Sequence, residues 1–234
     1  MKTLSPLSND PAFALAFRTL QPPPAQPTSL LVLLHGVGGN ESNLAALGAE
    51  VDSHTLVVLP RGPITLGPMA FGWFRVAFSS NGPQIVASEA DASRRILIDF
   101  IGQLQQAHGI DAAHTVVAGF SQGGILSASV ALTAPERVAA FAVLAGRILP
   151  ELEPLLASAD RLFALRGYIA HGTHDDKLPV SWAQRSDDWL TRLGVAHETK
   201  LHPTGHELDA SMRADFLAWL ARDEQRGSRF DPAN

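Results

Sequence analysis

The chain has 234 residues, of which 46% are hydrophobic, and its formal net charge is −5. This length and composition fit one folded domain, while the negative charge argues against nucleic acid or an anionic membrane as the main partner. The absence of cysteine excludes disulfides, thiolate metal ligands and a cysteine nucleophile.

The hydropathy pattern indicates where the protein resides. Residues 1–10 contain no apolar stretch typical of a signal peptide, and no segment reaches the ~20 apolar residues of a membrane span. We therefore expect a cytoplasmic protein without stable membrane insertion. Residues 1–29 are predicted to form an edge strand, Ala12–Leu20, followed by an extended proline-rich loop, Gln21–Thr28.

Apolar runs and helix-like segments alternate along the rest of the chain. Strands are predicted at Leu30–Leu34, Thr55–Leu59, Thr115–Ala118, Val138–Ala145, Phe163–Ala170 and His197–Leu201. Helices are predicted at Glu41–Glu50, Ser88–Ala107, Gln122–Thr133, Pro179–Leu193 and His206–Ala221, with a polar tail over residues 224–234. This alternation predicts a single α/β domain, residues 1–234, with a mostly parallel sheet and helices on both faces.

The first buried strand ends in a glycine-rich loop, His35-Gly36-Val37-Gly38-Gly39-Asn40. Glycines let backbone amides come close to a bound group, and the next helix begins just beyond. We expect the amide of Val37 to be one of the two donors of an oxyanion hole, with the amide of Gln122 as the other. An ordinary glycine-rich turn or a phosphate loop is the alternative, although no lysine follows the glycines as in a Walker-type site.

The segment Arg61–Ile85 lacks clear periodicity and carries aromatic residues, among them Trp73 and Phe74, between glycines and prolines. Long irregular segments in compact domains are usually functional or disordered, and the aromatic residues argue against disorder. We therefore expect this segment to form part of the wall of a functional site.

The central motif is Gly119-Phe120-Ser121-Gln122-Gly123, which lies between a predicted strand and a predicted helix. In this context a G-x-S-x-G pattern indicates a nucleophile elbow, where the chain reverses sharply and presents the serine hydroxyl. The residues two before and two after the serine crowd each other in such a turn, so both are expected to lack a Cβ. A glycine-flanked turn serine without catalytic function is the alternative for the bare pattern.

A late strand ends in His171-Gly172-Thr173-His174-Asp175-Asp176. A carboxylate at this place is where a hydrolase holds the group that orients its histidine. Metal binding by His171, His174 and an aspartate is the rival interpretation, although Gly172 and the strand end argue against the regular helix on which an H-x-x-H pair is most convincing.

His206 follows the last predicted strand, within Gly205-His206-Glu207. Ser121, Asp175 and His206 then occur in the chain order that is typical of α/β-hydrolase triads. This position favours His206 as the general base, although a lone loop histidine is normally a solvated side chain.

With these residues in place, the chain resembles an α/β-hydrolase, and more narrowly the phospholipase/carboxylesterase family that includes the acyl-protein thioesterases. The resemblance covers residues 30–220 approximately and rests on the segments Leu34–Glu41, Pro60–Pro63, Gly72–Phe74, Gly119–Gly124, His171–Asp175 with Pro179, and Gly205–Glu207. The sequence Gly-Phe-Ser-Gln-Gly is more specific than the bare elbow pattern.

The resemblance implies a Ser121–Asp175–His206 triad, an oxyanion hole of the Val37 and Gln122 amides, and no cofactor. It also implies a small-molecule ester or thioester substrate. A homodimer is left open. Acyl transfer or cofactor-free perhydrolysis on the same triad, or a non-catalytic binding protein of the same fold, are the alternatives.

The resemblance further implies that Trp73 lies beside the acyl pocket, with Phe74 next to it. Leu178 replaces the family's usual valine, Arg75 stands where an acidic residue is common, and Arg147 where an uncharged residue is common. We expect the two arginines to lie near the substrate pocket and to favour substrates with an anionic part, the alternative being two solvated surface side chains. The short spacing from Arg147 to Leu162 predicts that no cap domain covers the site.

Overall fold

The computed structural model describes residues 2–79 and 82–227 of the chain. Within these residues, eight strands form one central sheet in the order β1-β2-β4-β3-β9-β10-β11-β12. They are β1 (Thr3–Leu4), β2 (Phe17–Gln21), β3 (Ser29–Leu34), β4 (Thr55–Pro60), β9 (Thr115–Phe120), β10 (Ala140–Leu144), β11 (Arg166–Gly172) and β12 (Ala196–His202). The strands from β4 onward in this order run parallel, whereas β1 and β2 pair antiparallel at one edge. The predicted, mostly parallel α/β sheet is confirmed.

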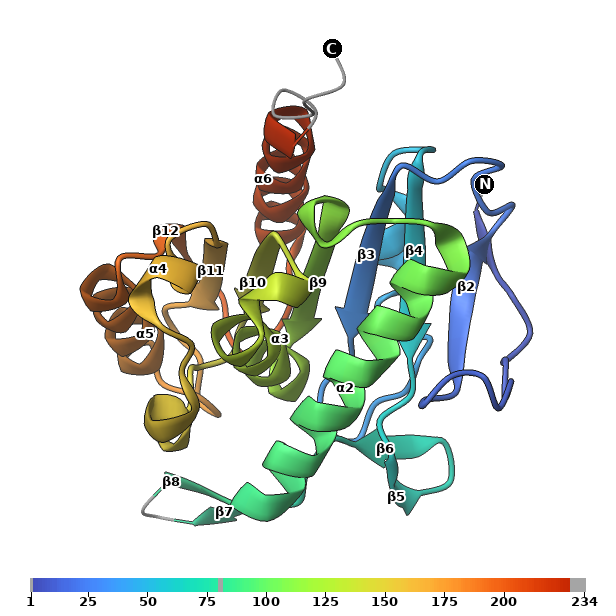
Figure 1. Ribbon diagram of the computed structural model, residues 1–234. Helices are drawn as coiled ribbons and strands as arrows, with labels where there is room; N and C mark the ends of the chain where they lie inside the picture. The colour runs from blue at the N-terminus through green and yellow to red at the C-terminus, as the bar shows by residue number, and fades with distance from the viewer. Residues whose placement is uncertain (1, 80–81, 228–234) are drawn as a thin grey trace.

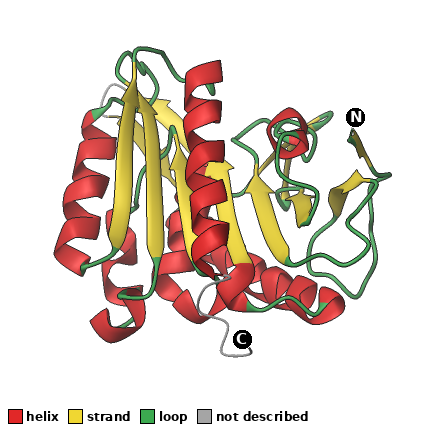
Figure 2. Cartoon of the chain, turned by 90° about the horizontal axis from the view of Figure 1, so that it is seen from above, coloured by secondary structure: helices red, strands yellow, loops and turns green. Residues whose placement is uncertain are grey.

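Helices cover both faces of this sheet, as Figures 1 and 2 show. They are α1 (Ala45–Ala49), α2 (Ala87–His108), α3 (Gln122–Thr133), α4 (Ala159–Leu162), α5 (Ser181–Leu193) and α6 (Ala210–Gly227), with short 3₁₀ helices at η1 (Ala112–His114), η2 (Pro135–Arg137) and η3 (Pro150–Leu155). Strand β3 shows why the layers form. Its side chains alternate between two buried clusters, Leu31 and Leu33 facing one and Leu30, Val32 and Leu34 facing the other.

Each cluster is closed by its own set of helices. Leu97 and Phe100 of α2, together with α3 and α5, cover the cluster that contains Leu30. Met212 and Phe216 of α6, together with the region of α1, cover the cluster that contains Leu31. Because both faces of the central strands are covered, their sequences are apolar throughout rather than alternating.

Several predicted boundaries are wrong, among them the start of the helix predicted at Glu41, which begins at Ala45, and of the strand predicted at Phe163, which begins at Arg166. Two further errors have a visible cause. The expected edge strand Ala12–Leu20 starts only at Phe17, because residues 11–15 form turns in which the Asp10 carboxylate accepts the Ala12 amide at 2.9 Å. This strand is β2, and it is not the edge of the sheet, since β1 pairs with it on its outer side. The last helix starts at Ala210 rather than His206, because the Asp209 carboxylate accepts the Met212 amide at 2.7 Å and caps the helix there.

The C-terminal prediction also differs from the structure. Helix α6 continues to Gly227, beyond the predicted end at Ala221. The remainder of the predicted polar tail, residues 228–234, lies outside the described residues.

The segment Arg61–Ile85 is more regular than predicted. It forms two small antiparallel hairpins, from β5 (Ile64–Gly67) and β6 (Ala70–Gly72) and from β7 (Val76–Ser79) and β8 (Gly82–Ile85). Both hairpins lie at the bottom of Figure 1, at the edge toward which the arrows of β3 and β9 point. The segment therefore sits at the carboxyl edge of the sheet, where a site is expected in this class of fold.

The connection between β10 and β11 is short and holds only η3 and α4. In the described part of the chain, no helix combines the length and the apolar character needed to cross a bilayer.

The short β10–β11 connection leads us to expect no activation at lipid interfaces. A cap that opens on a surface would need more chain than this connection offers. The rate of hydrolysis of a medium-chain p-nitrophenyl ester, measured through its critical micelle concentration, should follow one smooth saturation curve. A sharp rise in rate at that concentration would contradict the expectation.

Candidate active site

The carboxyl ends of neighbouring parallel strands bring the predicted site residues to one edge of the sheet. Val37 follows β3, Ser121 follows β9 and Arg147 follows β10. Asp175 follows β11 and His206 follows β12. Residues that are 31 to 85 positions apart in the sequence therefore come into hydrogen-bonding contact.

Ser121 lies in a turn that its glycine neighbours make possible. Its backbone angles are φ 53° and ψ −116°, a combination that is costly for a residue with a Cβ. A Cβ on Gly119 would lie 2.3 Å from the carbonyl carbon of Gly123, and one on Gly123 would lie 2.1 Å from the carbonyl oxygen of Leu34. The crowding expected between the two glycines is present, and the contact with Leu34 adds a second reason for glycine. Ser121 is only 8% exposed, so the elbow is more enclosed than a free tip.

A continuous chain of hydrogen bonds joins the three predicted triad residues. His206 Nε2 lies 2.9 Å from Ser121 Oγ, and His206 Nδ1 lies 2.7 Å from Asp175 Oδ2. A carboxylate can only accept, so it fixes the proton on Nδ1 and leaves Nε2 free to accept the serine proton. The geometry is that of a nucleophile, a base and a group that orients the base.

Asp175 is held in place by its surroundings. Its Oδ1 accepts the backbone amides of Lys177 at 2.9 Å and Leu178 at 2.8 Å, and His171 Nε2 lies 3.3 Å from Oδ2. The Asp175 side chain is fully buried, whereas the neighbouring Asp176 side chain is 75% exposed and forms an ion pair with Lys177. Asp175 is thus the carboxylate that faces the imidazole.

Backbone hydrogen bonds fix the loop of His206 to the loop of Asp175. Thr173 donates its amide to the His202 carbonyl at 2.7 Å, and His174 donates to Thr204 at 3.0 Å. The His206 ring also packs on Phe120, the residue before the serine, with ring centroids 5.1 Å apart. These contacts limit the rotation of the imidazole away from the triad.

The two residues expected to form the oxyanion hole with their amides line the same cavity as Ser121. The Val37 amide donates no hydrogen bond within the described residues, and Val37 lines the same cavity as Ser121. Gln122 is the first residue of α3, so its amide has no acceptor inside the helix. Both groups are therefore available to a negative charge that develops beside Ser121.

The Gln122 side chain ties the elbow to the hairpin segment. Its Oε1 accepts the Trp73 amide at 2.7 Å, and its Nε2 donates to the Phe74 carbonyl at 2.6 Å. A buried amide side chain with both ends bonded is stable and rigid. This bridge explains why glutamine follows the serine, a role that sequence reasoning missed.

His35 and Trp73 hold the oxyanion loop, which is the glycine-rich segment His35–Asn40 that carries the Val37 amide. His35 Nδ1 donates to the Gly36 carbonyl at 2.7 Å, and Nε2 accepts the Gly62 amide at 2.9 Å. The Trp73 indole donates to the His35 carbonyl at 2.9 Å. Both side chains are buried, so Trp73 supports the loop instead of lining the cavity. The resemblance placed Trp73 beside the pocket, and its neighbour Phe74 provides the surface there.

A charged cluster holds Glu41, the residue that directly follows the same loop. The buried Glu41 carboxylate accepts hydrogen bonds from Arg61 at 2.7 and 2.8 Å and from Arg18 at 3.1 Å. The Arg61 hydrogen bonds are the main cause that lowers the pKa of Glu41 to about 2. Glu41 and Arg61 both belong to the segments that carry the family resemblance, but no local pattern in the sequence reveals that they pair.

The cavity beside Ser121 is small, about 30 Å³. It is lined by Val37, Phe74, Val76, Pro83, Ile85, Ser121, Gln122, Ile125, Arg147, Lys177, Leu178 and His206. Of the two arginines expected here, the structure places Arg147 in the lining. Arg75 instead lies exposed and forms an ion pair with Glu89.

A larger cavity of about 470 Å³ lies on the other side of the oxyanion loop and shares Val37 with the first. Its apolar side chains include Leu44, Leu47, Phe120 and Leu208. The volume falls within the ~300–1,000 Å³ typical of small-molecule sites.

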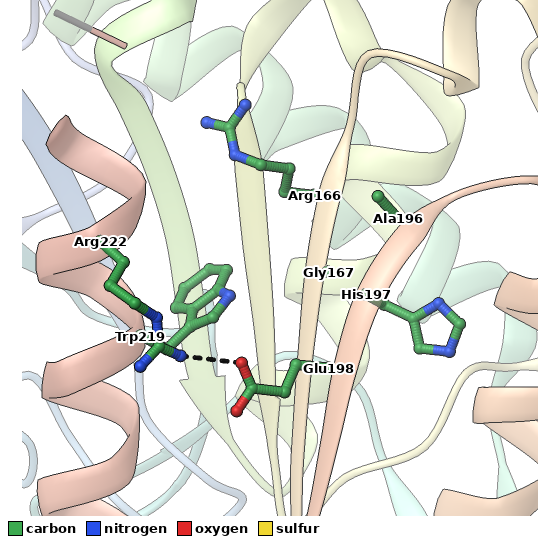
Figure 3. Close-up of a pocket in the computed structure, with 7 residues that line it drawn as sticks. All are labelled: Arg166, Gly167, Ala196, His197, Glu198, Trp219 and Arg222. Carbon is green, nitrogen blue, oxygen red and sulfur yellow. Dashed lines mark hydrogen bonds and ion pairs between the residues drawn. The ribbon is translucent and has the colours of Figure 1, made fainter. Parts of the chain in front are cut away.

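A further cavity of about 170 Å³ lies at the opposite edge of the sheet, where β11 and β12 begin (Figure 3). The Arg222 guanidinium forms an ion pair with Glu198 across it at 2.8 Å, and Trp219 forms part of its wall. The triad residues are absent from its lining, so it is separate from the predicted active site.

The rival metal interpretation lacks a suitable set of ligands. His171 is buried and its Nε2 donates to the Leu178 carbonyl at 2.7 Å, whereas His174 is exposed. Throughout residues 2–79 and 82–227, no three histidine, aspartate or glutamate side chains converge as metal ligands.

Comparison with known proteins places the chain in a family. The model of the phospholipase/carboxylesterase family matches residues 16–222. The chain belongs to this family. Family membership confirms the resemblance read from the motifs and makes the chain a member of a group of esterase and thioesterase hydrolases.

Similar proteins agree with this family. The chain is 27% identical to acyl-protein thioesterase 1 of Mycosarcoma maydis over 186 residues, which cover 70% of this chain and 76% of that protein. The crystal structure of a carboxylesterase from Mesorhizobium loti matches with a TM-score of 0.79 at 25% identity, covering 93% of this chain and 98% of that one. Esterase PE8 matches with a TM-score of 0.75 at 25% identity, covering 85% and 94%. The α/β-hydrolase fold is thereby confirmed.

The contrast between two neighbouring carboxylates tests the triad. Asp175→Asn keeps the shape of the side chain but adds a donor, which favours the wrong tautomer of His206, so we expect kcat to fall by up to ~10⁴-fold. Asp176→Asn, at an exposed position, should change kcat by less than about twofold. Measuring kcat of both variants on one p-nitrophenyl ester shows which of the two carboxylates orients His206. A crippled Asp176→Asn enzyme beside an active Asp175→Asn enzyme would refute the assignment.

The buried His35 predicts a pH dependence of stability. Burial is the main cause that lowers the pKa of His35 below its ordinary value of 6.5. The unfolded chain therefore binds a proton here more readily than the folded chain. The contribution of a neutral His35 to stability is complete above pH 6.5 and is lost as the pH falls toward the lower folded pKa.

Replacing His35 should weaken this dependence. Between pH 7.5 and 5, the free energy of unfolding of the parent should fall more steeply than that of His35→Gln. The difference between the two slopes should be at most ~1.4 kcal/mol per pH unit, the contribution of one titrating group. Urea denaturation at several pH values measures both slopes, with His54→Gln at an exposed position as the control. Equal slopes for His35→Gln and the parent protein would show that His35 does not titrate differently in the two states.

Proposed function

We propose that this chain is a serine hydrolase that cleaves carboxylic esters or thioesters through an acyl-enzyme intermediate. The observation that carries the proposal is the hydrogen-bond chain from Ser121 through His206 to the buried Asp175. Family membership supports hydrolysis as the reaction class. The Val37 and Gln122 amides supply the remaining requirement, a place for negative charge beside the nucleophile.

In the first half-reaction, His206 Nε2 accepts the proton of Ser121 as Oγ attacks the carbonyl carbon. The carbonyl oxygen becomes an oxyanion, which the Val37 and Gln122 amides stabilise by hydrogen bonds. When the tetrahedral intermediate collapses, the bond to the alcohol or thiol breaks and His206 delivers the proton to the leaving group. Asp175 stabilises the positive imidazolium throughout.

In the second half-reaction, water takes the place of the leaving group. His206 accepts a proton from water, whose oxygen attacks the acyl-serine carbonyl through a second oxyanion. Collapse of this intermediate breaks the bond to Ser121 Oγ, returns the proton to the serine and releases the carboxylic acid. One ester and one water thus give one acid and one alcohol or thiol.

The two cavities support a substrate with two unequal parts. The Ser121 cavity of about 30 Å³ admits only a small group, whereas the neighbouring apolar cavity of about 470 Å³ suits a longer hydrocarbon part. Because the Mycosarcoma maydis relative is an acyl-protein thioesterase, thioesters belong in the substrate panel beside oxygen esters and lysophospholipids. A cytoplasmic location stays a prediction from the sequence.

The nucleophile provides the decisive test. Ser121→Ala should reduce hydrolysis of a short p-nitrophenyl ester by about 10⁶-fold, because Oγ is the attacking atom. Its only side-chain hydrogen bond within the described residues joins it to His206, so the melting temperature should change by a few degrees at most. Rates and thermal melts of both proteins measure the two effects.

A labelling experiment separates the proposal from contamination. A fluorophosphonate probe should label the parent protein and leave Ser121→Ala unlabelled. Full activity of a pure Ser121→Ala preparation would overturn the proposal. Product analysis with methanol present then shows whether water or an alcohol accepts the acyl group.

A further inference from the structure

We propose that Arg147 forms a carboxylate-binding subsite beside Ser121, so that the preferred substrates are esters or thioesters that carry a carboxylate. The inference rests on the proposed hydrolase function and deepens it by naming the class of substrate. Arg147 would determine specificity through binding, without taking part in the bond-breaking steps.

The first observation is a nearly buried arginine without a hydrogen-bond or ion-pair partner. Arg147 is only 6% exposed, and its Nε is fully buried without a hydrogen bond. Within the described residues, no carboxylate lies within ion-pair distance of Arg147. Its terminal nitrogens have no hydrogen-bond acceptor and, unlike Nε, are not fully buried. Buried charges are normally paired, because an unpaired one loses its hydration without compensation. A nearly buried arginine that lines a cavity and has no polar partner is suited to bind an anion.

The second observation is that the protein holds this side chain in place. The Arg147 guanidinium lies over the Trp182 ring of α5, 4.3 Å from its centroid. The next residue, Ile148, donates its amide to Ser186 of the same helix at 3.1 Å. The turn before it begins at Ala145, whose φ of 49° is costly for a residue with a Cβ. A costly turn and a stacked ring together hold Arg147, a residue of the cavity lining, in one position.

The third observation is the charge of the cavity. Its described lining contains the cations Arg147 and Lys177 but no aspartate or glutamate. Burial lowers the pKa of Arg147 and the more distant Glu151 opposes this effect. An arginine nevertheless remains protonated in proteins, so the cavity presents a fixed positive charge. A planar guanidinium matches a carboxylate better than it matches a point charge.

The second arginine that departs from the family pattern shows the contrast. Arg75 is exposed, and both its guanidinium and its backbone amide bond the Glu89 carboxylate. Its charge is thus already neutralised, and Arg75 is absent from the described lining of the Ser121 cavity. Of the two, only Arg147 has the burial, the missing partner and the position that a subsite requires.

The test compares matched esters. Mono-p-nitrophenyl glutarate carries a carboxylate in its acyl half, and its methyl ester is the neutral counterpart. 4-Acetoxybenzoate and its methyl ester form the second pair, with the carboxylate in the leaving group. For one of the two pairs, Arg147→Met should raise KM for the anionic ester by roughly 10- to 100-fold and change KM for the neutral ester by less than about twofold. The pair that responds identifies the half of the substrate that meets Arg147.

Two further variants serve as controls. Arg185 also lies over the Trp182 ring, 4.9 Å from its centroid, but is exposed and outside the cavity lining, so Arg185→Gln removes an equal charge without the subsite. It should leave every KM within about twofold. Arg147→Lys keeps the charge without the planar fork and should give an intermediate KM for the anionic ester.

Inhibition gives a readout that is independent of turnover of the anionic esters. Free glutarate should compete with p-nitrophenyl acetate on the parent protein, and its inhibition constant should rise at least about tenfold in Arg147→Met. The melting temperature of Arg147→Met should equal or exceed that of the parent, since the substitution removes an unpaired buried charge.

The outcomes separate this inference from the proposed function. Equal effects of Arg147→Met on anionic and neutral esters in both pairs, with unchanged glutarate inhibition, would overturn the subsite while the hydrolase function stands. A parent protein that cleaves none of the four esters and resists the fluorophosphonate probe would overturn the proposed function, and the subsite with it.

Discussion

The tight turn at Ser121 is the constraint on which the site depends. Its backbone conformation is costly, and it persists because the neighbouring structure fixes it from both sides: the Ser121 amide donates to Leu144 at 2.8 Å, and the Ser121 carbonyl accepts the Ile125 amide at 3.0 Å. The turn also requires β9, α3 and the end of β3 to approach within contact of backbone atoms, which only Gly119 and Gly123 permit. Once these elements meet, the serine, the start of α3 and the glycine-rich loop after β3 share one small cavity.

A buried polar network transmits this constraint to the surrounding loops. Gln122 connects the elbow to the Trp73–Phe74 segment, and Trp73 connects that segment to His35 on the oxyanion loop. Each polar atom named here is satisfied, so the network avoids the desolvation cost of an unpaired buried group and holds a single arrangement. The position of the Val37 amide therefore depends also on His35 and Trp73, which are absent from the described lining of the Ser121 cavity. This dependence is why the aromatic hairpin segment belongs to the site.

The sequence predicts that Ser121, Asp175 and His206 lie together, but it does not predict the contacts that hold them, for a physical reason. Ser121 and Asp175 each follow an apolar run, and all three residues have a glycine within three positions, so local patterns mark the strand ends that place them at one edge. The pairing of Glu41 with Arg61, or of Gln122 with Trp73 across 49 residues, leaves no local pattern because it is created by packing. For the same reason, the sequence alone does not distinguish the environments of Arg75 and Arg147. Only the partners Glu89 and Trp182 distinguish an exposed, paired Arg75 from a buried Arg147.

The two kinds of positive environment around Ser121 are suited to different tasks. In the proposed mechanism, the Val37 and Gln122 amides face a charge that appears only in the transition state, so their interaction accelerates the chemical step. A substrate carboxylate at Arg147 would carry the same charge before, during and after the reaction. Its interaction would strengthen the substrate complex and the transition state equally, which lowers KM without raising kcat. An unpaired buried cation is a standing cost to the folded protein, and a cost of that kind is retained most readily where a ligand repeatedly supplies the missing partner.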